Sequence, residues 1–145
     1  AFLAAKEGLI VMKIIIIYGS ENDRAYLDGG KTYLRENGME YEEKVLSVHR
    51  NFEELSEYLD SLRTGGEKCV FIAVAGLSAA LPGIVAGRTD MPVIGVPVPA
   101  ALNGIDALLS IIQMPGGVPV ASVGIHGKAP LNACILAGRI ASLAG

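Results

Sequence analysis

Hydrophobic residues follow two different periods along this chain, and the change from one to the other marks its expected elements. Short runs of β-branched and small apolar residues, such as Lys13–Tyr18 with its four isoleucines, are typical of strands buried on both faces. Between these runs, apolar residues recur at intervals of three and four, as they do on one face of a helix. The expected strands are 13–18, 40–46, 68–75, 92–96 and 118–124, and the expected helices are about 20–37, 51–65, 82–86, 104–112 and 130–143.

Strand and helix alternate five times, which is the pattern of an α/β domain: a three-layer sandwich around a five-stranded parallel sheet. Parallel strands need right-handed crossovers, so few topologies remain, and we expect a flavodoxin-like strand order. Residues 13–145 are predicted to form a single domain. Residues 1–12 are interpreted as an N-terminal extension, from an expression vector or an upstream segment, and they lack the basic start and cleavage site of a signal peptide.

Small and capping residues refine three of the expected helices. Ser20 or Asn22 is expected to cap the first helix, where Gly29 and Gly30 suggest close packing against a neighbouring element. Asn51 opens the second helix and forms a capping-box-like pair with the glutamate three residues on. Small residues along the last helix permit a close approach to another surface, and these are Ala133, Ala137, Gly138 and Ala141.

Two further expectations concern the second half of the chain. The fourth strand is expected to end in a turn at Pro97-Val98-Pro99, and the helix at 104–112 is expected to stop at Gln113-Met114-Pro115. That helix carries its large apolar residues at helical spacing, and these are Ile105, Leu108, Leu109 and Ile112.

Composition narrows the class of protein without identifying it. Of the 145 residues, 51% are hydrophobic and 19% are charged, which is typical of an ordered globular chain. The net charge is −3 and no basic run occurs, so we expect no nucleic-acid partner. No apolar run reaches the roughly 18 residues of a membrane span, and we expect no membrane partner and a cytoplasmic location. Cys69 and Cys134 lie in apolar segments and fit no zinc or disulfide pattern, which predicts buried thiols and no metal site.

A histidine and an arginine lie together where the second predicted strand ends and the next helix begins. His49 and Arg50 belong to the stretch Ser47–Asn51, and the carboxyl edge of a parallel sheet is where ligands bind in such folds. Histidine can pass a proton near neutral pH, and arginine can clamp a phosphate or carboxylate with two parallel hydrogen bonds. A solvated polar loop is the alternative interpretation, and the residues alone leave both open.

Three other segments are expected at the same edge of the sheet. The turn Gly19–Asp23 starts a helix, where backbone N–H groups can bind phosphate, but an ordinary capped turn is the simpler alternative. It matches neither the dinucleotide-binding fingerprint nor a P-loop. Gly76–Gly83 holds small residues that let a ligand approach the backbone, or it forms a tight turn. His126 follows the fifth strand and is either a site residue or a surface histidine.

Taken in order, these segments resemble the PurE family of purine-pathway enzymes, which place a carboxylate on aminoimidazole ribonucleotide. The resemblance runs from about Ile14 to the end of the chain. The motifs that carry it are Gly-Ser-x-x-Asp from Gly19, Ser-x-His-Arg from Ser47, Ala-Gly-x-x-Ala-x-Leu-Pro-Gly from Ala75, Pro-Val-Ile-Gly-Val-Pro-Val from Pro92, Gly-x-Asp-x-Leu-x-Ser-x-x-Gln-Met-Pro-x-Gly-x-Pro-Val from Gly104 and Asn-Ala from Asn132.

The resemblance implies a flavodoxin-like fold assembled as a homo-octamer, acting on a phosphorylated aminoimidazole ribonucleotide with no metal or organic cofactor. In one form of the family the enzyme is a mutase, an isomerase that converts N-carboxyaminoimidazole ribonucleotide to 4-carboxy-5-aminoimidazole ribonucleotide. The carboxylate moves from the exocyclic nitrogen to a ring carbon. A second form, a carboxy-lyase, carboxylates aminoimidazole ribonucleotide directly with carbon dioxide. We expect the mutase, with direct carboxylation or a non-catalytic nucleotide-binding member as alternatives.

Carried over by position, His49 resembles the general acid/base of the family. The residues that correspond to substrate-binding positions are Ser20, Asp23, Ser47, Arg50, Gly76, Ser78 and Leu81. One histidine can protonate the departing nitrogen and then remove the proton from the accepting carbon. Water-poor walls that would retain released carbon dioxide are expected at 76–83 and 97–101.

The chain departs from the mutase pattern of the family at two points. Ala80 stands where the mutase form usually has histidine, and with Ser78 it resembles the direct-carboxylase form. Arg50 and Leu81-Pro82-Gly83 instead resemble the mutase form. Family members also usually continue into a further C-terminal helix that packs on a neighbouring subunit, whereas this sequence ends at Gly145.

Overall fold

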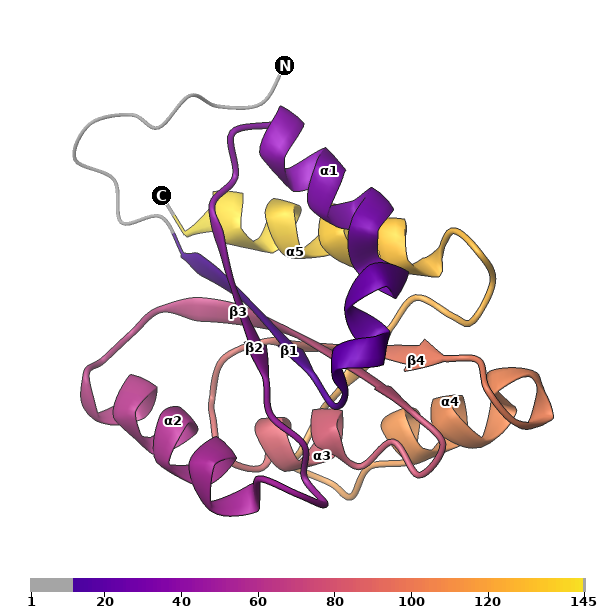
Figure 1. Cartoon of the computed structure of the whole chain (residues 1–145). Helices are drawn as coiled ribbons and strands as arrows, with labels where there is room; N and C mark the ends of the chain where they lie inside the picture. Colours follow the sequence, from indigo (N-terminus) through magenta and orange to yellow (C-terminus); the bar gives the residue numbers. More distant parts are fainter. Residues whose placement is uncertain (1–11, 145) are drawn as a thin grey trace.

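Five parallel strands form the middle layer of this computed structural model, which describes residues 12–144 (Figure 1). The strands are β1 (Lys13–Tyr18), β2 (Tyr41–Val45), β3 (Cys69–Gly76), β4 (Val93–Val98) and β5 (Ala121–Ser122). Their order across the sheet is β2-β1-β3-β4-β5, and each neighbouring pair is parallel. The predicted α/β class and flavodoxin-like strand order are therefore confirmed. Residues 1–11 of the expected N-terminal extension lie outside the described residues.

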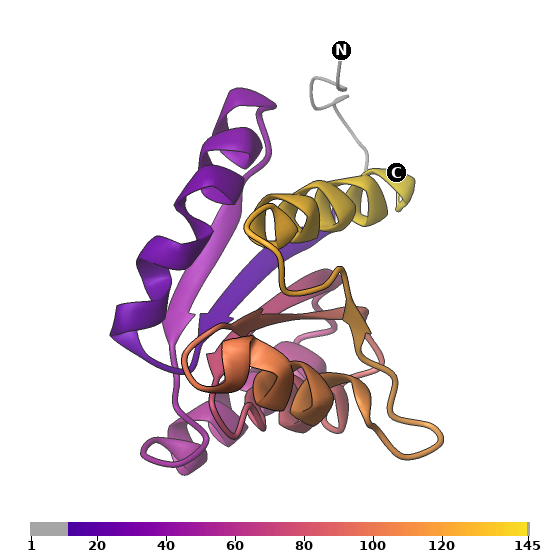
Figure 2. The same cartoon turned by 90° about the vertical axis from the view of Figure 1, so that its right-hand side faces the viewer.

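Helices cover both faces of the sheet, which gives the structure three layers (Figure 2). α1 and α5 lie on one face, and α2, α3 and α4 lie on the other (Figure 1). The helical segments are the 3₁₀ helix η1 (Glu21–Leu27), α1 (Asp28–Glu36), α2 (Phe52–Thr64), α3 (Leu81–Ala86), the 3₁₀ helix η2 (Leu102–Gly104), α4 (Ile105–Ile112) and α5 (Ala129–Leu143). Within residues 12–144, each helix is too short or too polar to cross a bilayer.

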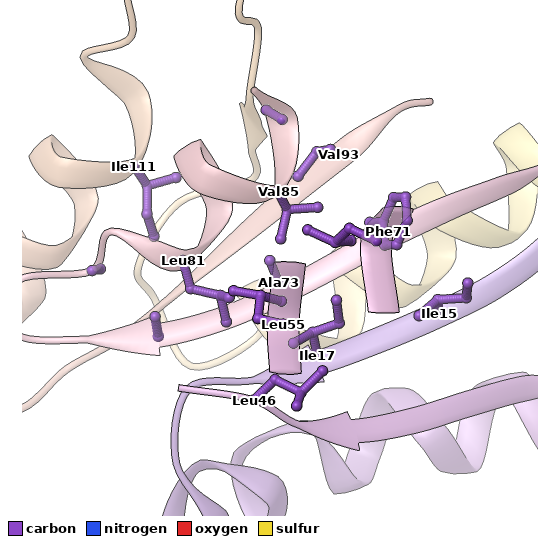
Figure 3. Packing of buried hydrophobic residues seen from close by; sticks show 14 of the residues in the cluster. Ile15, Ile17, Leu46, Leu55, Phe71, Ala73, Leu81, Val85, Val93 and Ile111 are labelled. Atoms are coloured by element: carbon purple, nitrogen blue, oxygen red, sulfur yellow. The ribbon is translucent and has the colours of Figure 1, made fainter. Parts of the chain in front are cut away.

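The isoleucine run of β1 is continuous because both faces of this strand are covered. Ile15 and Ile17 belong to the core beneath α2, α3 and α4 (Figure 3). Ile14 and Ile16 point the other way, into the core beneath α1 and α5. All four side chains are at most 1% exposed. A strand between two helical layers has no solvated face, so its sequence shows no alternation of apolar and polar residues.

α1 and α5 pack closely because small residues lie between them. A Cβ atom at Gly30 would overlap Cys134 Sγ and would lie 3.0 Å from the Pro130 carbonyl oxygen, whereas a Cβ atom at Gly29 would meet nothing within 4 Å. The close packing expected at the glycine pair therefore holds at Gly30 and not at Gly29. The small residues of α5 are buried within this same chain, and these are Ala133, Ala137, Gly138 and Ala141.

The starts of the first two helices differ from expectation. η1 is a 3₁₀ segment, and regular α-helix begins only at Asp28. Ser20 provides the expected cap, since its Oγ accepts a hydrogen bond from the Asn22 N–H at 3.3 Å. The capping-box prediction at Asn51 was wrong, because its side chain makes no capping bond. A capping box also needs a free N–H at the cap residue, and the Asn51 N–H already donates to the Ser47 carbonyl at 2.8 Å.

β4 continues through Pro97, where a turn was expected. The Pro92 carbonyl accepts from the Phe71 N–H of β3. Successive residues of a parallel strand direct their N–H and C=O groups to opposite neighbouring strands. Pro97 is five residues further on and therefore faces away from β3. Its missing N–H costs no ladder bond, because pairing with β5 stops at Gly95 and Ser122. β5 has two residues rather than the seven predicted at 118–124.

α4 buries a different face from the one that its largest apolar residues suggested. Ala107 and Ile111 are fully buried, and a Cβ atom at Gly95 of β4 would overlap the Ile111 side chain. The exposed residues are Ile105 at 46%, Leu109 at 46% and Ile112 at 44%. The helix itself was predicted correctly, but its wide apolar face points away from this chain's core.

We expect Gly30→Ala to lower the free energy of unfolding by about 1–3 kcal/mol, because the new methyl group would overlap the Cys134 sulfur. Gly29→Ala is the matched control in the same turn of α1. It should raise the free energy of unfolding by about 0.5–1 kcal/mol, because alanine is the better helix residue and has free space there. Urea unfolding followed by circular dichroism measures both. Equal stabilities would contradict the close α1–α5 contact.

Candidate active site

A cleft of about 450 Å³ opens at the carboxyl ends of β1, β2 and β3. The chain leaves β1 toward β2 on one side, while β3 lies on the other side of β1. Loops diverge at such a switch point in the strand order, and the crevice between them is where ligands bind in open parallel sheets. Three loops form the cleft, one after each strand.

The loop after β1 presents a hydroxyl and a carboxylate to the cleft, from Ser20 and Asp23. The Gly19 N–H donates to the Val74 carbonyl at 2.9 Å, which ties this loop to the end of β3. The Asp23 N–H donates to the Ser20 carbonyl at 3.1 Å, so the two side chains stay about one turn apart. Burial raises the pKa of the Asp23 carboxyl, and a hydrogen bond from the backbone at Ser20 partly opposes that rise.

The loop after β2 is a tight turn that carries His49 and Arg50. Ser47 is only 7% exposed, and its carbonyl closes the turn by accepting the Asn51 N–H. Val48 packs against the core between the sheet and α2. His49 and Arg50 are both exposed and line the cleft. The buried start of the turn and the hydrogen bond that closes it therefore hold an imidazole and a guanidinium at the cleft.

The loop after β3 brings small residues and one exposed leucine to the cleft. Gly76 must stay small, because a Cβ atom there would lie 3.1 Å from the Val98 carbonyl oxygen of β4. Leu81 is 2% exposed and begins α3, so it anchors the far end of the loop in the core. The residues that line the cleft from this loop are Ala75, Gly76, Leu77, Ser78, Ala80 and Leu81.

The residues that correspond to the catalytic and substrate-binding positions of the family all line this one cleft, and these are Ser20, Asp23, Ser47, His49, Arg50, Gly76, Ser78 and Leu81. His126 is not among the lining residues. It is exposed in the loop before α5, and its Nδ1 accepts the Lys128 N–H at 3.2 Å. The segment 97–101, expected as a water-poor wall, also contributes no lining residue.

Sequence reasoning passed over Leu77, which lines the cleft between motif residues. Its side chain is apolar, so it carries no chemical signal of its own. Its backbone φ is +53°, in the left-handed region that bulky residues rarely adopt. That conformation cannot be recognised from the residue type.

Glu43 of β2 holds the loop after β1 from both ends, in a group that we call the Glu43 cluster: Glu43, Tyr18, Arg24 and Lys31. Glu43 Oε1 accepts hydrogen bonds from the Tyr18 hydroxyl at 2.8 Å and from Lys31 Nζ at 3.1 Å. Arg24 Nη1 lies 3.3 Å from the same oxygen. Tyr18 ends β1 and Arg24 lies in η1, so one carboxylate fixes the chain before and after the cleft-lining loop. No motif in the sequence pointed to this cluster.

The Glu43 cluster favours charged forms of both Glu43 and Lys31. Burial raises the pKa of the Glu43 carboxyl, but hydrogen bonds from Tyr18 and Lys31 and the charges of Lys31 and Arg24 lower it by more. Its pKa therefore lies below the ordinary value of 4.5. Burial lowers the pKa of Lys31, but hydrogen bonds to Glu43 and Asp28 raise it by more. The contact is an ion pair at neutral pH.

The polar groups of the cleft suit an anionic, hydroxylated organic ligand. They comprise hydroxyls, one carboxylate, one imidazole and one guanidinium. Within residues 12–144, no three histidine, cysteine, aspartate or glutamate side chains come together as they would to hold a metal ion. Cys69 and Cys134 are buried as predicted, and burial raises the pKa of their thiols to about 11 and about 12.

Comparison with known proteins gives matches along nearly the whole chain. The family described as AIR carboxylase matches residues 13–145. The N5-carboxyaminoimidazole ribonucleotide mutase of Saccharolobus solfataricus is 48% identical over 129 residues, which are 88% of this chain and 80% of that protein. The mutase of the same name from Methanocaldococcus jannaschii is 49% identical over 131 residues, 90% of this chain and 79% of that protein. The crystal structure of Treponema denticola PurE has a TM-score of 0.81 and 31% identity, covering 92% of this chain and 82% of that one.

We expect Glu43→Gln to lower the free energy of unfolding at pH 7 by about 1–3 kcal/mol, because Tyr18, Lys31 and Arg24 lose a charged acceptor. The pKa of Glu43 is lower in the folded state, so its stabilisation is present above pH 4.5 and is lost as pH falls through the folded pKa. The difference between wild type and Glu43→Gln should therefore shrink below pH 4.5. Urea unfolding at several pH values measures it, with Glu36→Gln, exposed on α1, as the control. A difference that does not change with pH would contradict the charged cluster.

Proposed function

Because the chain belongs to the AIR carboxylase family, also called the PurE family, we propose that it is the purine-pathway mutase that converts N-carboxyaminoimidazole ribonucleotide to 4-carboxy-5-aminoimidazole ribonucleotide. The resemblance found in the motifs is confirmed by the matches of family and relatives. The observation that carries the proposal to this chain is the shared cleft, which His49 and Arg50 line together with Ser20 and Asp23.

We propose that the loops after β1 and β2 bind the ribose phosphate of the substrate. Arg50 is exposed at the rim and can donate two parallel hydrogen bonds to a phosphate. The hydroxyls of Ser20 and Ser47 offer further donors to the phosphate oxygens. The Asp23 carboxylate is an acceptor suited to ribose hydroxyls. These contacts hold the nucleotide by its non-reacting part, which positions the imidazole ring for reaction.

His49 is the proposed general acid and base. As the N–C bond breaks, its electron pair returns to the exocyclic nitrogen, which takes a proton from the His49 imidazolium and releases carbon dioxide. The ring carbon then bonds to carbon dioxide, and the proton on that carbon passes to the neutral imidazole. One side chain thus serves both steps and returns to its starting state, as a general acid/base does.

The small residues of the third loop support a role in retaining carbon dioxide between the two steps. Gly76 and Ala80 line the cleft and leave room close to the backbone. Leu81 behind them is buried in the core and keeps that side dry. Gly76, Ser78 and Leu81 are therefore proposed to shape the pocket around the ring.

Direct carboxylation of aminoimidazole ribonucleotide is the second candidate. Ser78 and Ala80 favour it, because both line the cleft where the mutase form of the family usually has histidine at the second position. One preparation, assayed with each substrate, distinguishes the candidates. A rate that depends on bicarbonate, with the unmodified ribonucleotide as substrate, would replace the mutase with the carboxylase. Binding without turnover in either assay would indicate a non-catalytic member of the family.

We expect His49→Asn to lower mutase turnover by about 10²–10⁴-fold, because asparagine cannot carry the proton. Its melting temperature should stay close to that of wild type, since His49 is exposed. His126→Asn is the matched control, because it changes the chain's other histidine, which lies outside the cleft lining, and should keep full turnover. Normal turnover in His49→Asn would rule out the proposed role.

We also propose that the protein is a homo-oligomer, an octamer by family resemblance, located in the cytoplasm. Support for self-association comes from the exposed face of α4, where Ile105, Leu109 and Ile112 form a stripe with helical spacing. Monomeric proteins rarely expose contiguous apolar patches larger than roughly a few hundred Å², and larger patches mark interaction sites. A second copy of the chain could pair stripe against stripe across a two-fold axis.

Leu109→Glu places a charge in this stripe and should reduce the mass of the assembly measured by light scattering, because a buried unpaired charge is costly. Leu143→Glu is the control, since Leu143 is 85% exposed near the end of α5 and away from the stripe. The wild type should exceed the monomer mass of 15.1 kDa. A monomeric wild type, or an unchanged mass in Leu109→Glu, would remove the stripe as an interface.

A further inference from the structure

Leu77 combines a strained backbone with a large side chain that gains little from folding. Its φ of +53° is unfavourable for a residue with a Cβ atom, and the side chain is large. The side chain is also 56% exposed, so its apolar surface is only partly removed from water. A glycine at this position would avoid the backbone strain and would forgo little buried apolar area. Strained residues of this kind concentrate at functional sites.

The surrounding loop holds the backbone of Leu77 in place. The Leu77 carbonyl accepts the Ala79 N–H at 2.9 Å, and the Ser78 carbonyl accepts the Ala80 N–H at 2.8 Å. Ala79 is fully buried, and Gly76 on the other side is in contact range of Val98. These contacts fix the direction of the leucine at the mouth of the cleft.

Among the residues that line the cleft, Leu77 is the one large apolar side chain that is exposed. Leu81 is 2% exposed and committed to the core. Val48 is partly buried and packs against the same core. The other lining side chains are small or polar. A planar ring that enters the cleft can therefore make an apolar contact with the exposed side chain of Leu77.

We propose that Leu77 is a specificity-determining and positioning residue, whose side chain covers the imidazole ring of the bound ribonucleotide and excludes water from the reacting carboxylate. This inference rests on the proposed function and deepens it. The phosphate and ribose are held by the loops after β1 and β2, while Leu77 approaches the ring from the loop after β3. An apolar side chain over the ring discriminates between ligands by the shape of the ring rather than by its charge.

The cover has a chemical consequence that can be measured. After the N–C bond breaks and the nitrogen is protonated, carbon dioxide has two fates. It can bond to the ring carbon, with loss of that carbon's proton to His49. Alternatively, it can leave the cleft, and aminoimidazole ribonucleotide is then the product. An intact cover favours the first fate. Loss of the cover should release more aminoimidazole ribonucleotide for each turnover.

Leu77→Gly removes the side chain and relieves the positive φ. We expect kcat/KM for the mutase reaction to fall about tenfold, as for loss of an apolar contact in a pocket, and the fraction of aminoimidazole ribonucleotide among the products to rise. Its melting temperature should not fall, because glycine accepts this conformation without strain. Leu77→Met keeps an apolar cover and should retain the wild-type ratio of products.

Leu102→Gly is the matched control, since Leu102 also has a positive φ, of 47°, and is 73% exposed, but it lies outside the cleft lining. It should leave kcat/KM and the product ratio unchanged. Wild-type kinetics in Leu77→Gly, or an equal loss in Leu102→Gly, would overturn the role of Leu77 while mutase turnover by the wild type left the proposed function standing. Absence of turnover in the wild type would instead overturn the proposed function.

Discussion

Burial of the central strands on both faces is the constraint on which the rest of this structure depends. β1 and β3 lie between two helical layers, and their side chains are almost fully buried. A strand in that position can carry few polar side chains, because each would need a partner inside an apolar core. Polar chemistry is therefore confined to the points where the strands end. Three such ends meet at the switch point between β1 and β3, which is where the cleft lies.

Glu43 is a polar group that this constraint still allows, because β2 is an edge strand of the sheet. Its carboxylate faces the core beneath α1, where it meets the Tyr18 hydroxyl, Lys31 and Arg24. Removing one member of a partly buried ion pair leaves the other charge with fewer partners, so the cluster tolerates little change. The Glu43 cluster therefore sets the geometry of the loop after β1 without entering the cleft. The same contact therefore stabilises the fold and holds the loop that carries Ser20 and Asp23.

The cleft and the α4 stripe show where this chain gives up stability. Gly76 and its neighbours open space at the end of the most buried strand, and Leu77 is strained and exposed beside them. The stripe of Ile105, Leu109 and Ile112 leaves apolar area in water. The exposed side chains of Leu77 and of the stripe gain little from folding within one subunit, and the proposed ligand and second subunit would cover them. The surrounding layers are well packed, and their stability offsets the cost of these features.

The sequence by itself determined the fold class, the strand order and the set of polar residues along the cleft. Apolar periodicity decides which segments are strands and helices, and ordered motifs such as Ser47–Arg50 mark the loops that follow them. Local pattern could not decide which apolar face of α4 would be buried, because that depends on the space beside Gly95 in β4. It could not locate the Glu43 cluster, whose members come from β1, η1, α1 and β2 and meet only after the strands pair. Nor could it place Leu77 in a left-handed conformation, since a leucine gives no sign of a positive φ and part of the support for its loop, the pairing of Gly76 with Val98, comes from another strand. Local conformational preference depends on residues that are neighbours in the sequence. These features depend largely on contacts between residues far apart in the sequence, and only the tertiary structure decides such contacts.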